Sequence, residues 1–125
     1  TDASFDNTFE SDFWGSVTPG MDIPDLPDSQ LALQAGFETQ TGLRGSATYY
    51  AYGSTCSVAS CAAGTYVDSY NVIDASLTKM FNDQLDVYMV VENITDETDV
   101  VARAPKNGAR AQKPRSFTLG VRYRL

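Results

Sequence analysis

The segment with the clearest capacity for chemistry is VVARAPKNGARAQKPR, residues 100–115. It holds five cations and no acidic residue: Arg103, Lys106, Arg110, Lys113 and Arg115. Cations gathered in one segment attract an anionic ligand, because a focused field raises the local concentration of that ligand. Basic runs are also commonly no more than a solvated surface. The segment therefore predicts either an anion-binding loop or a hydrated one.

Two cysteines form the second candidate site. Cys56 and Cys61 are separated by four residues inside YGSTCSVASCAAGTY, a stretch rich in small and polar side chains. A zinc site needs more ligands than this stretch offers, and a redox pair more often has the C-x-x-C spacing. We expect a disulfide that closes a surface loop, which implies an oxidising compartment. Two inert thiols are the alternative.

Several functions are excluded by composition. The 125 residues include no histidine, which removes the commonest general base and transition-metal ligand. There is no cysteine–base pair and no G-x-S-x-G elbow, so we do not expect an enzyme, and we expect no metal or cofactor. The net charge is −7, and all 16 acidic residues precede position 100. Nucleic-acid binding is not expected of so acidic a chain.

The elements that must position these residues are predicted to be β-strands. Apolar and polar side chains alternate with a period of two, and no segment of comparable length shows a helical period. The chain is therefore predicted to be an all-β antiparallel meander of about six strands. The segments are residues 29–39, 43–52, 73–81, 85–93 and 116–125, with a weaker one at residues 3–13 that carries Phe5, Phe9 and Phe13.

The connections between these segments alternate in length. TQTG (39–42) and NDQ (82–84) are tight turns, whereas residues 14–28, 53–69 and 96–115 are long connections. Alternate connections of a meander lie at the same end of the sheet, so one end carries all the long ones. Transmembrane β-barrels have this arrangement, with short periplasmic turns and long extracellular loops. About ten tilted residues also suffice to cross the hydrocarbon core.

The membrane prediction assigns a role to each face. Leu, Val, Ile, Phe and Ala would contact lipid, and Ser, Thr, Gln and the charged residues would line the interior. Lys79 interrupts the apolar row close to a tight turn, where a long cation reaches the interface. Tyr49, Phe81, Phe117 and Tyr123 could form interfacial aromatic girdles. The interior charges are expected to pair with one another: Arg44, Asp74, Asp86, Glu92, Arg122 and Arg124.

From about residue 22 onward the chain resembles the C-terminal end of a TonB-dependent outer-membrane receptor. DIPDLPDSQLALQAGFE resembles a late barrel strand that follows a Pro-x-x-Pro loop. YNVIDASLTKMFNDQLDVYMVVENITDET resembles the next hairpin, whose Asn93-Ile94-Thr95-Asp96 stands where the family commonly has Asn-Leu-Phe-Asp. GARAQKPRSFTLGVRYRL resembles the final loop and strand. Among subgroups, the ferric-citrate-type siderophore receptors look nearest.

The resemblance explains the strict alternation at the C-terminus. The last strand of such a receptor closes the barrel against the first, and its apolar pattern is read by the barrel-assembly machinery. The residues that would carry this signal are Phe117, Leu119, Val121, Tyr123 and Leu125. The family usually ends in an aromatic residue, commonly Phe, so Leu125 is a departure.

The resemblance also implies that residues 1–125 are the C-terminal strands and extracellular loops of a longer receptor. Family members have about 22 strands and an N-terminal plug with a TonB-contacting box, and neither the plug nor the box is in this sequence. The implied partners are the rest of the barrel and its plug, the lipid bilayer, lipopolysaccharide, the assembly machinery, and TonB through the absent N-terminal part. The implied location is the bacterial outer membrane.

The implied function is energy-coupled uptake of a ferric-siderophore-type ligand. A ferric chelate is commonly anionic, so Arg103, Lys106, Arg110 and Lys113 are candidate contacts, together with Tyr50 and Tyr52 below the cysteine loop. The basic residues could instead contact lipopolysaccharide phosphates, and Arg115 is expected to be structural. A small passive outer-membrane barrel and a soluble β-barrel binding module remain alternatives. The first would need two more strands, and the second would need a dry core.

Overall fold

The computed structural model describes residues 3–103 and 108–124. Every regular element in these residues is a β-strand, and no helix among them is long and apolar enough to cross a bilayer. The chain divides into two compact units. The sheet unit comprises Leu31–Tyr50, Asn71–Glu97 and Lys113–Leu125, and the loop unit comprises Thr1–Gln30, Ala51–Tyr70 and Thr98–Gln112.

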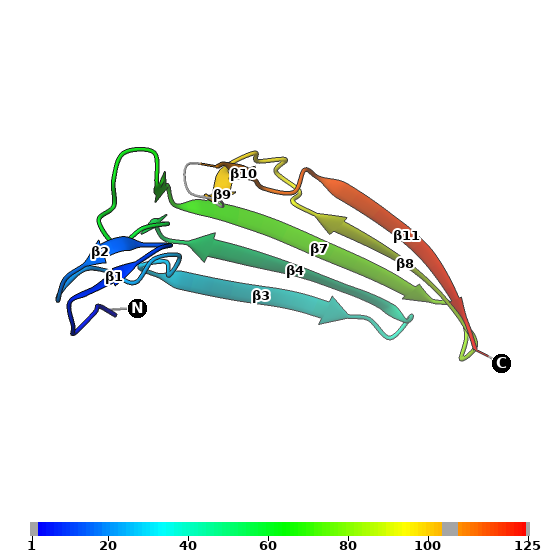
Figure 1. Cartoon of the computed structure of the whole chain (residues 1–125). Coiled ribbons are helices and arrows are strands. Elements are labelled where there is room, and N and C mark those ends of the chain that lie inside the picture. Colours follow the sequence, from blue (N-terminus) through cyan, green and yellow to red (C-terminus); the bar gives the residue numbers. More distant parts are fainter. Residues whose placement is uncertain (1–2, 104–107, 125) are drawn as a thin grey trace. The chain divides into compact units, whose positions relative to one another are not determined.

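Five long strands form one antiparallel sheet in the order β11-β8-β7-β4-β3 (Figure 1). They run in sequence order across the sheet, which is the predicted meander. The sheet is open, with β3 and β11 as its edges, so it has the form of a barrel segment and not of a closed barrel. The bounds are β3 (Gln30–Glu38), β4 (Leu43–Tyr52), β7 (Tyr70–Met80), β8 (Leu85–Glu92) and β11 (Ser116–Tyr123).

The strand register keeps the two faces chemically separate. Leu119 lies opposite Met89 and Val121 opposite Val87, while Arg122, the residue after Val121, lies opposite Asp86 on the other face. On the other side of β8, Leu77 also lies opposite Met89. Because successive side chains point to opposite faces, apolar rows form on one face and polar rows on the other. The predicted period of two is confirmed.

Local hydrogen bonds explain the two tight turns. In the β3–β4 turn the Thr39 amide donates to the Leu43 carbonyl, at 2.9 Å, and Gly42 takes a φ of +76° that glycine adopts without strain. In the β7–β8 turn the Asn82 side-chain oxygen accepts hydrogen bonds from the amides of Gln84 and Leu85, at 2.9 and 2.8 Å. Asn is suited to such a turn because its side chain can replace a backbone acceptor.

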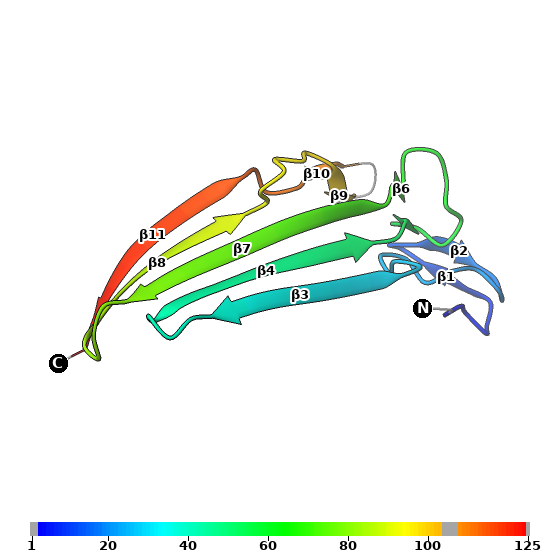
Figure 2. The same cartoon turned by 180° about the vertical axis from the view of Figure 1, so that it is seen from behind.

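The tight turns both lie at one end of the sheet, so every longer connection leaves from the other end (Figure 2). This is the predicted sorting. The longer connections, together with the segment before β3, contain three two-stranded hairpins. They are β1 (Phe9–Ser11) with β2 (Gly15–Val17), β5 (Thr55–Cys56) with β6 (Tyr66–Val67), and β9 (Val100–Ala102) with β10 (Arg110–Ala111).

The weak strand predicted at residues 3–13 is not a member of the sheet. Its one regular strand is β1, Phe9–Ser11, which pairs with β2 in the loop unit, and Ser4 forms an isolated bridge with Asp22. The strand stops because the Ser11 hydroxyl accepts hydrogen bonds from the amides of Phe13 and Trp14, both at 3.2 Å, which turns the chain. Phe5 packs on the Phe9 ring at 5.4 Å, so these aromatics form a local cluster.

The distribution of buried residues differs between the two units. The buried apolar side chains among the described residues, Val17, Val58, Ala59 and Val67, all belong to the loop unit. The buried side chains of the described sheet unit are polar, namely Asp86 and Asn93. The sheet therefore presents its apolar face to its surroundings and has no dry apolar core of its own.

Candidate functional site

The apolar face of the sheet is exposed to an unusual degree. Phe117, Leu119 and Val121 on the edge strand β11 are 69%, 76% and 67% exposed, and Tyr123 is exposed as well. Further exposed apolar side chains on the sheet are Leu31, Leu33, Phe37, Leu77 and Met89. A contiguous apolar surface of this kind needs a cover, either lipid or protein. Leu125, the last residue of the predicted assembly signal, lies outside the described residues.

Lys79 shows how a cation is accommodated on the apolar face. It lies opposite Val87, in the row below Leu77, and its Nζ donates a hydrogen bond to the Thr41 carbonyl at 2.6 Å. The methylene chain thus stays along the apolar surface while the ammonium group reaches the β3–β4 turn. This geometry is the one predicted for a cation at a membrane interface.

Charged side chains on the opposite face are paired. Asp86 is buried and contacts both Arg124, at 2.8 Å, and Arg122, at 3.7 Å. The Arg122 guanidinium also lies 5.8 Å from the centre of the Tyr88 ring. Together these contacts confirm the predicted pairing for Asp86, Arg122 and Arg124. Such pairs fasten β11 to β8 close to the tight turns.

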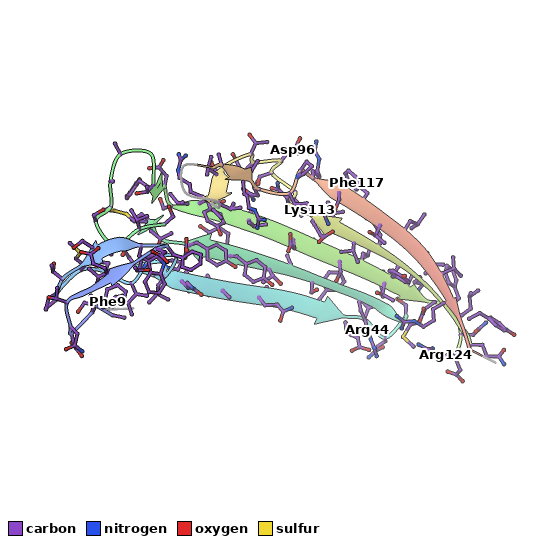
Figure 3. All side chains as sticks on the ribbon, viewed as in Figure 1. Phe9, Arg44, Asp96, Lys113, Phe117 and Arg124 are labelled. Atoms are coloured by element: carbon purple, nitrogen blue, oxygen red, sulfur yellow. A yellow bond between two sulfur atoms is a disulfide. The ribbon has the colours of Figure 1, made fainter. Side chains whose placement is uncertain are left out.

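The remaining predicted interior charges find other partners. Arg44 pairs with Glu38 at 2.7 Å, Glu92 pairs with Lys113 at 2.6 Å, and Asp74 accepts a hydrogen bond from the Asn93 amide at 2.9 Å. Figure 3 shows Arg44 and Arg124 at the end of the sheet that carries the tight turns, with Lys113 and Asp96 at the other end. Both ends of the polar face thus carry ion pairs.

The basic segment does not act as one patch of free cations. Lys113 and Arg115 belong to the sheet unit, where Lys113 pairs with Glu92 and Arg115 lies 3.6 Å from Asp96. Arg103 and Arg110 belong to the loop unit; Arg103 donates from Nε to the Tyr66 carbonyl at 2.7 Å, and Arg110 is exposed on β10. Lys106 lies outside the described residues. The acidic partners of the segment, Glu92 and Asp96, precede residue 100, so the pairing could not be predicted from the segment itself.

The two predicted tyrosines also fall in different units. Tyr52 stacks on Tyr70 in the loop unit, with ring centres 4.9 Å apart, and Tyr50 belongs to the sheet unit. The stacked pair lines a cavity of about 350 Å³ whose other walls include Asp25, Gln30 and Thr55. Tyr70 is an aromatic residue that the sequence did not suggest for the site.

Cys56 and Cys61 are bonded to each other, as predicted. The disulfide closes a loop in which Val58 and Ala59 are buried, and the Ser57 amide donates to the Thr65 carbonyl at 2.9 Å. Among the described residues, no cluster of three or more His, Cys, Asp or Glu side chains could hold a metal.

Removing this disulfide should loosen the loop unit locally. For a ring this small, chain entropy gives a stabilisation of about 2 kcal/mol, which corresponds to roughly 30-fold faster exchange of the protected amides. Hydrogen exchange of a Cys56→Ser/Cys61→Ser variant tests this, with the Ser57 amide as reporter. Ser60→Ala in the same loop is the control. Unchanged protection at Ser57 in the double variant would contradict a stabilising role.

A network of hydrogen bonds joins the end of β8 to the start of β11. Asn93 is buried, with a φ of +51°, and its side-chain Nδ2 donates to the carbonyls of Glu97 and Lys113, at 2.9 and 2.8 Å. Its Oδ1 accepts from the Glu97 amide at 3.2 Å. Asp96 accepts a hydrogen bond from the Arg115 amide at 2.9 Å. These are the first and last residues of the Asn-Ile-Thr-Asp segment.

No protein-family model and no curated protein sequence matches the chain. Solved structures of the ferric-catecholate import receptor Fiu from E. coli K12 do match. The closed form gives a TM-score of 0.70 at 26% identity, covering 80% of this chain and 14% of that one. The open form gives 0.65 at 23%, covering 78% and 15%.

The comparison shows that the chain has the fold of a receptor barrel segment, and that it spans about a seventh of the length of the receptor it matches. The matching protein is an import receptor. The comparison supports a TonB-dependent receptor barrel. It does not support the narrower prediction of a ferric-citrate-type receptor, because the matching protein imports ferric catecholates.

Proposed function

We propose that residues 1–125 are the C-terminal wall strands and extracellular connections of a TonB-dependent receptor in the bacterial outer membrane. The receptor would import a ferric-siderophore-type ligand. The observation that carries this proposal is the inverted sheet: apolar side chains such as Leu119 are exposed, while the charged Asp86 is buried and paired. A water-soluble sheet would place its apolar face inward, because burial of apolar surface drives folding in water.

In this proposal the segment builds wall and loops but does not transduce energy. The remaining strands of the barrel would pair with the open edges of β3 and β11, because unpaired edges are not tolerated inside a bilayer. The polar face would look toward the plug, and TonB would be reached only through the N-terminal part. The exposed apolar row of β11 would serve the assembly machinery, and outer-leaflet lipopolysaccharide would surround the loops.

The membrane assignment has a direct test. The protein that contains this chain should sediment with outer membranes and leave them only in detergent. It should also lose its monodisperse state when the detergent is removed. A protein that stays soluble and monodisperse without detergent would contradict the proposal.

Among the predicted contacts, Arg110 is the best candidate for an anionic ferric chelate. It is exposed and carries no ion pair within the described part of the chain, whereas Lys113 is already paired with Glu92. The stacked Tyr52 and Tyr70 supply an aromatic cavity in the same loop unit as Arg110. A planar aromatic chelate, such as a catecholate, suits that wall.

The ligand assignment predicts a charge-dependent loss of uptake. Arg110→Ala in the intact receptor should raise the half-saturating concentration of a radiolabelled ferric catecholate about fivefold, since one exposed charge contributes on the order of 1 kcal/mol. The loss should shrink at high salt. Arg110→Lys should keep most of the affinity, and surface abundance should be equal for all variants. Equal uptake by Arg110→Ala and wild type would remove Arg110 from the site.

A further inference from the structure

The apolar face of the sheet is hollowed in its middle. A cavity of about 450 Å³ opens on this face over strands β3, β4, β7 and β8. Small residues form its floor, and larger apolar residues rise around it. The floor includes Ala35, Gly45, Ala47 and Ala75, and the walls include Phe37, Leu77, Met89 and Val91.

Packing around Gly45 accounts for the hollow. The Phe37 ring lies directly over Gly45, and a side-chain carbon at this position would also come within 3.3 Å of Leu77. The glycine therefore lets Phe37 lie across the neighbouring strand. With alanines at 35, 47 and 75, the next row of the face has no bulk to fill the space. The result is an apolar depression on the face that we assign to lipid, where a flexible hydrocarbon chain could lie.

A single cation lies in the next row beyond this depression, toward the tight turns. Lys79 follows Leu77 by one step on the same face of β7, and Lys79 is the one charged side chain on the apolar face of the described strands. Its ammonium group donates one hydrogen bond to the Thr41 carbonyl. An ammonium group has three donors, so two stay available for an anion. The apolar depression and the cation that could bind an anion are therefore one step apart on the same face of β7.

We propose that this site binds an anionic phospholipid, with one acyl chain in the hollow and the phosphate at Lys79. The inference rests on the proposed membrane function, and it places the lipid in the leaflet on the side of the tight turns. A second copy of the protein is the less suitable occupant. A hollow of this size offers little area compared with the roughly 1,200 Å² of a stable protein interface, and a second apolar face would bring no anion to Lys79.

The test uses the intact receptor in a nonionic detergent and native mass spectrometry. The protein is incubated with equal amounts of phosphatidylglycerol and phosphatidylethanolamine, and the retained lipid is identified. Ala75→Phe fills the hollow, and Val121→Phe places the same side chain on the same face outside it. Lys79→Gln removes the cation, and Lys79→Arg keeps it. Heat-dependent gel mobility reports whether each variant is a folded barrel.

Wild type and Val121→Phe should retain phosphatidylglycerol in preference, and folded Ala75→Phe should lose most of it. Lys79→Gln should reduce the preference for phosphatidylglycerol about fivefold, the factor expected for one cation beside an anionic lipid, whereas Lys79→Arg should keep it. Undiminished lipid on folded Ala75→Phe, an unchanged preference in Lys79→Gln, or loss of a dimer in Ala75→Phe would overturn the lipid site. None of these results touches the membrane assignment, which fails only if the receptor proves soluble.

Discussion

Arginine at position 119 should prevent the receptor from accumulating as a folded barrel in the outer membrane. Leu119 is 76% exposed in the middle of the edge strand β11, on the face that we assign to lipid. An arginine on the lipid face of a β-barrel costs about 2–4 kcal/mol near the middle of the bilayer. A loss of this size shifts the folding equilibrium by roughly 30-fold to 1,000-fold. Heat-dependent gel mobility of the outer-membrane fraction measures the folded amount.

Thr118 provides a matched control one residue away. It lies on the opposite face, opposite Val90 of β8, in the row next to Ser116. Thr118→Arg adds the same side chain to the same strand, but toward the predicted aqueous interior. This variant should accumulate at close to the wild-type level. If Thr118→Arg fails and Leu119→Arg folds, the two faces have been assigned the wrong way round, and the receptor proposal fails with them.

The five long strands were predictable because their signal is local. An alternating pattern such as that of residues 116–123 determines both the strand and its two faces, and the turn residues at 39–42 and 82–84 determine the hairpins. The weak strand at residues 3–13 was wrong for a related reason. Its aromatic residues matched one face of a strand, but the Ser11 hydroxyl turned the chain after three extended residues.

Partners across the sheet were harder to predict, because they depend on the register between strands. Lys113 appeared unopposed within its own segment, yet Glu92 lies 2.6 Å away at the end of β8. The Tyr52–Tyr70 stack could have been found only through the β4–β7 register. The Ser46 and Ser76 hydroxyls are hydrogen-bonded across these strands. Because the strands are antiparallel, the residue six positions after Ser46, Tyr52, lies beside the residue six positions before Ser76, Tyr70. The narrower prediction of a ferric-citrate-type receptor rested on the resemblance alone, and the structural comparison does not support it.

The second large effect concerns Asn93, which holds the start of β11 in place. Its side chain satisfies the Glu97 amide and the carbonyls of Glu97 and Lys113 in a buried position. A buried polar group that loses its partner costs about 1–3 kcal/mol. The left-handed backbone at residue 93 adds to the cost, since asparagine tolerates a positive φ better than alanine does.

Asn93→Ala should therefore destabilise the β8–β11 connection by about 3 kcal/mol or more, because three backbone groups lose their partner at once. The freed segment should become a protease target, with cleavage after Arg115 accelerated more than a hundredfold. Limited trypsin digestion of the purified receptor measures this rate. Asn82→Ala is the matched control, because Asn82 also accepts two backbone hydrogen bonds but lies exposed in a tight turn. Cleavage after Arg115 that is no faster in Asn93→Ala than in Asn82→Ala would show that the ion pairs of β11, and not the buried amide, hold the last strand in the sheet.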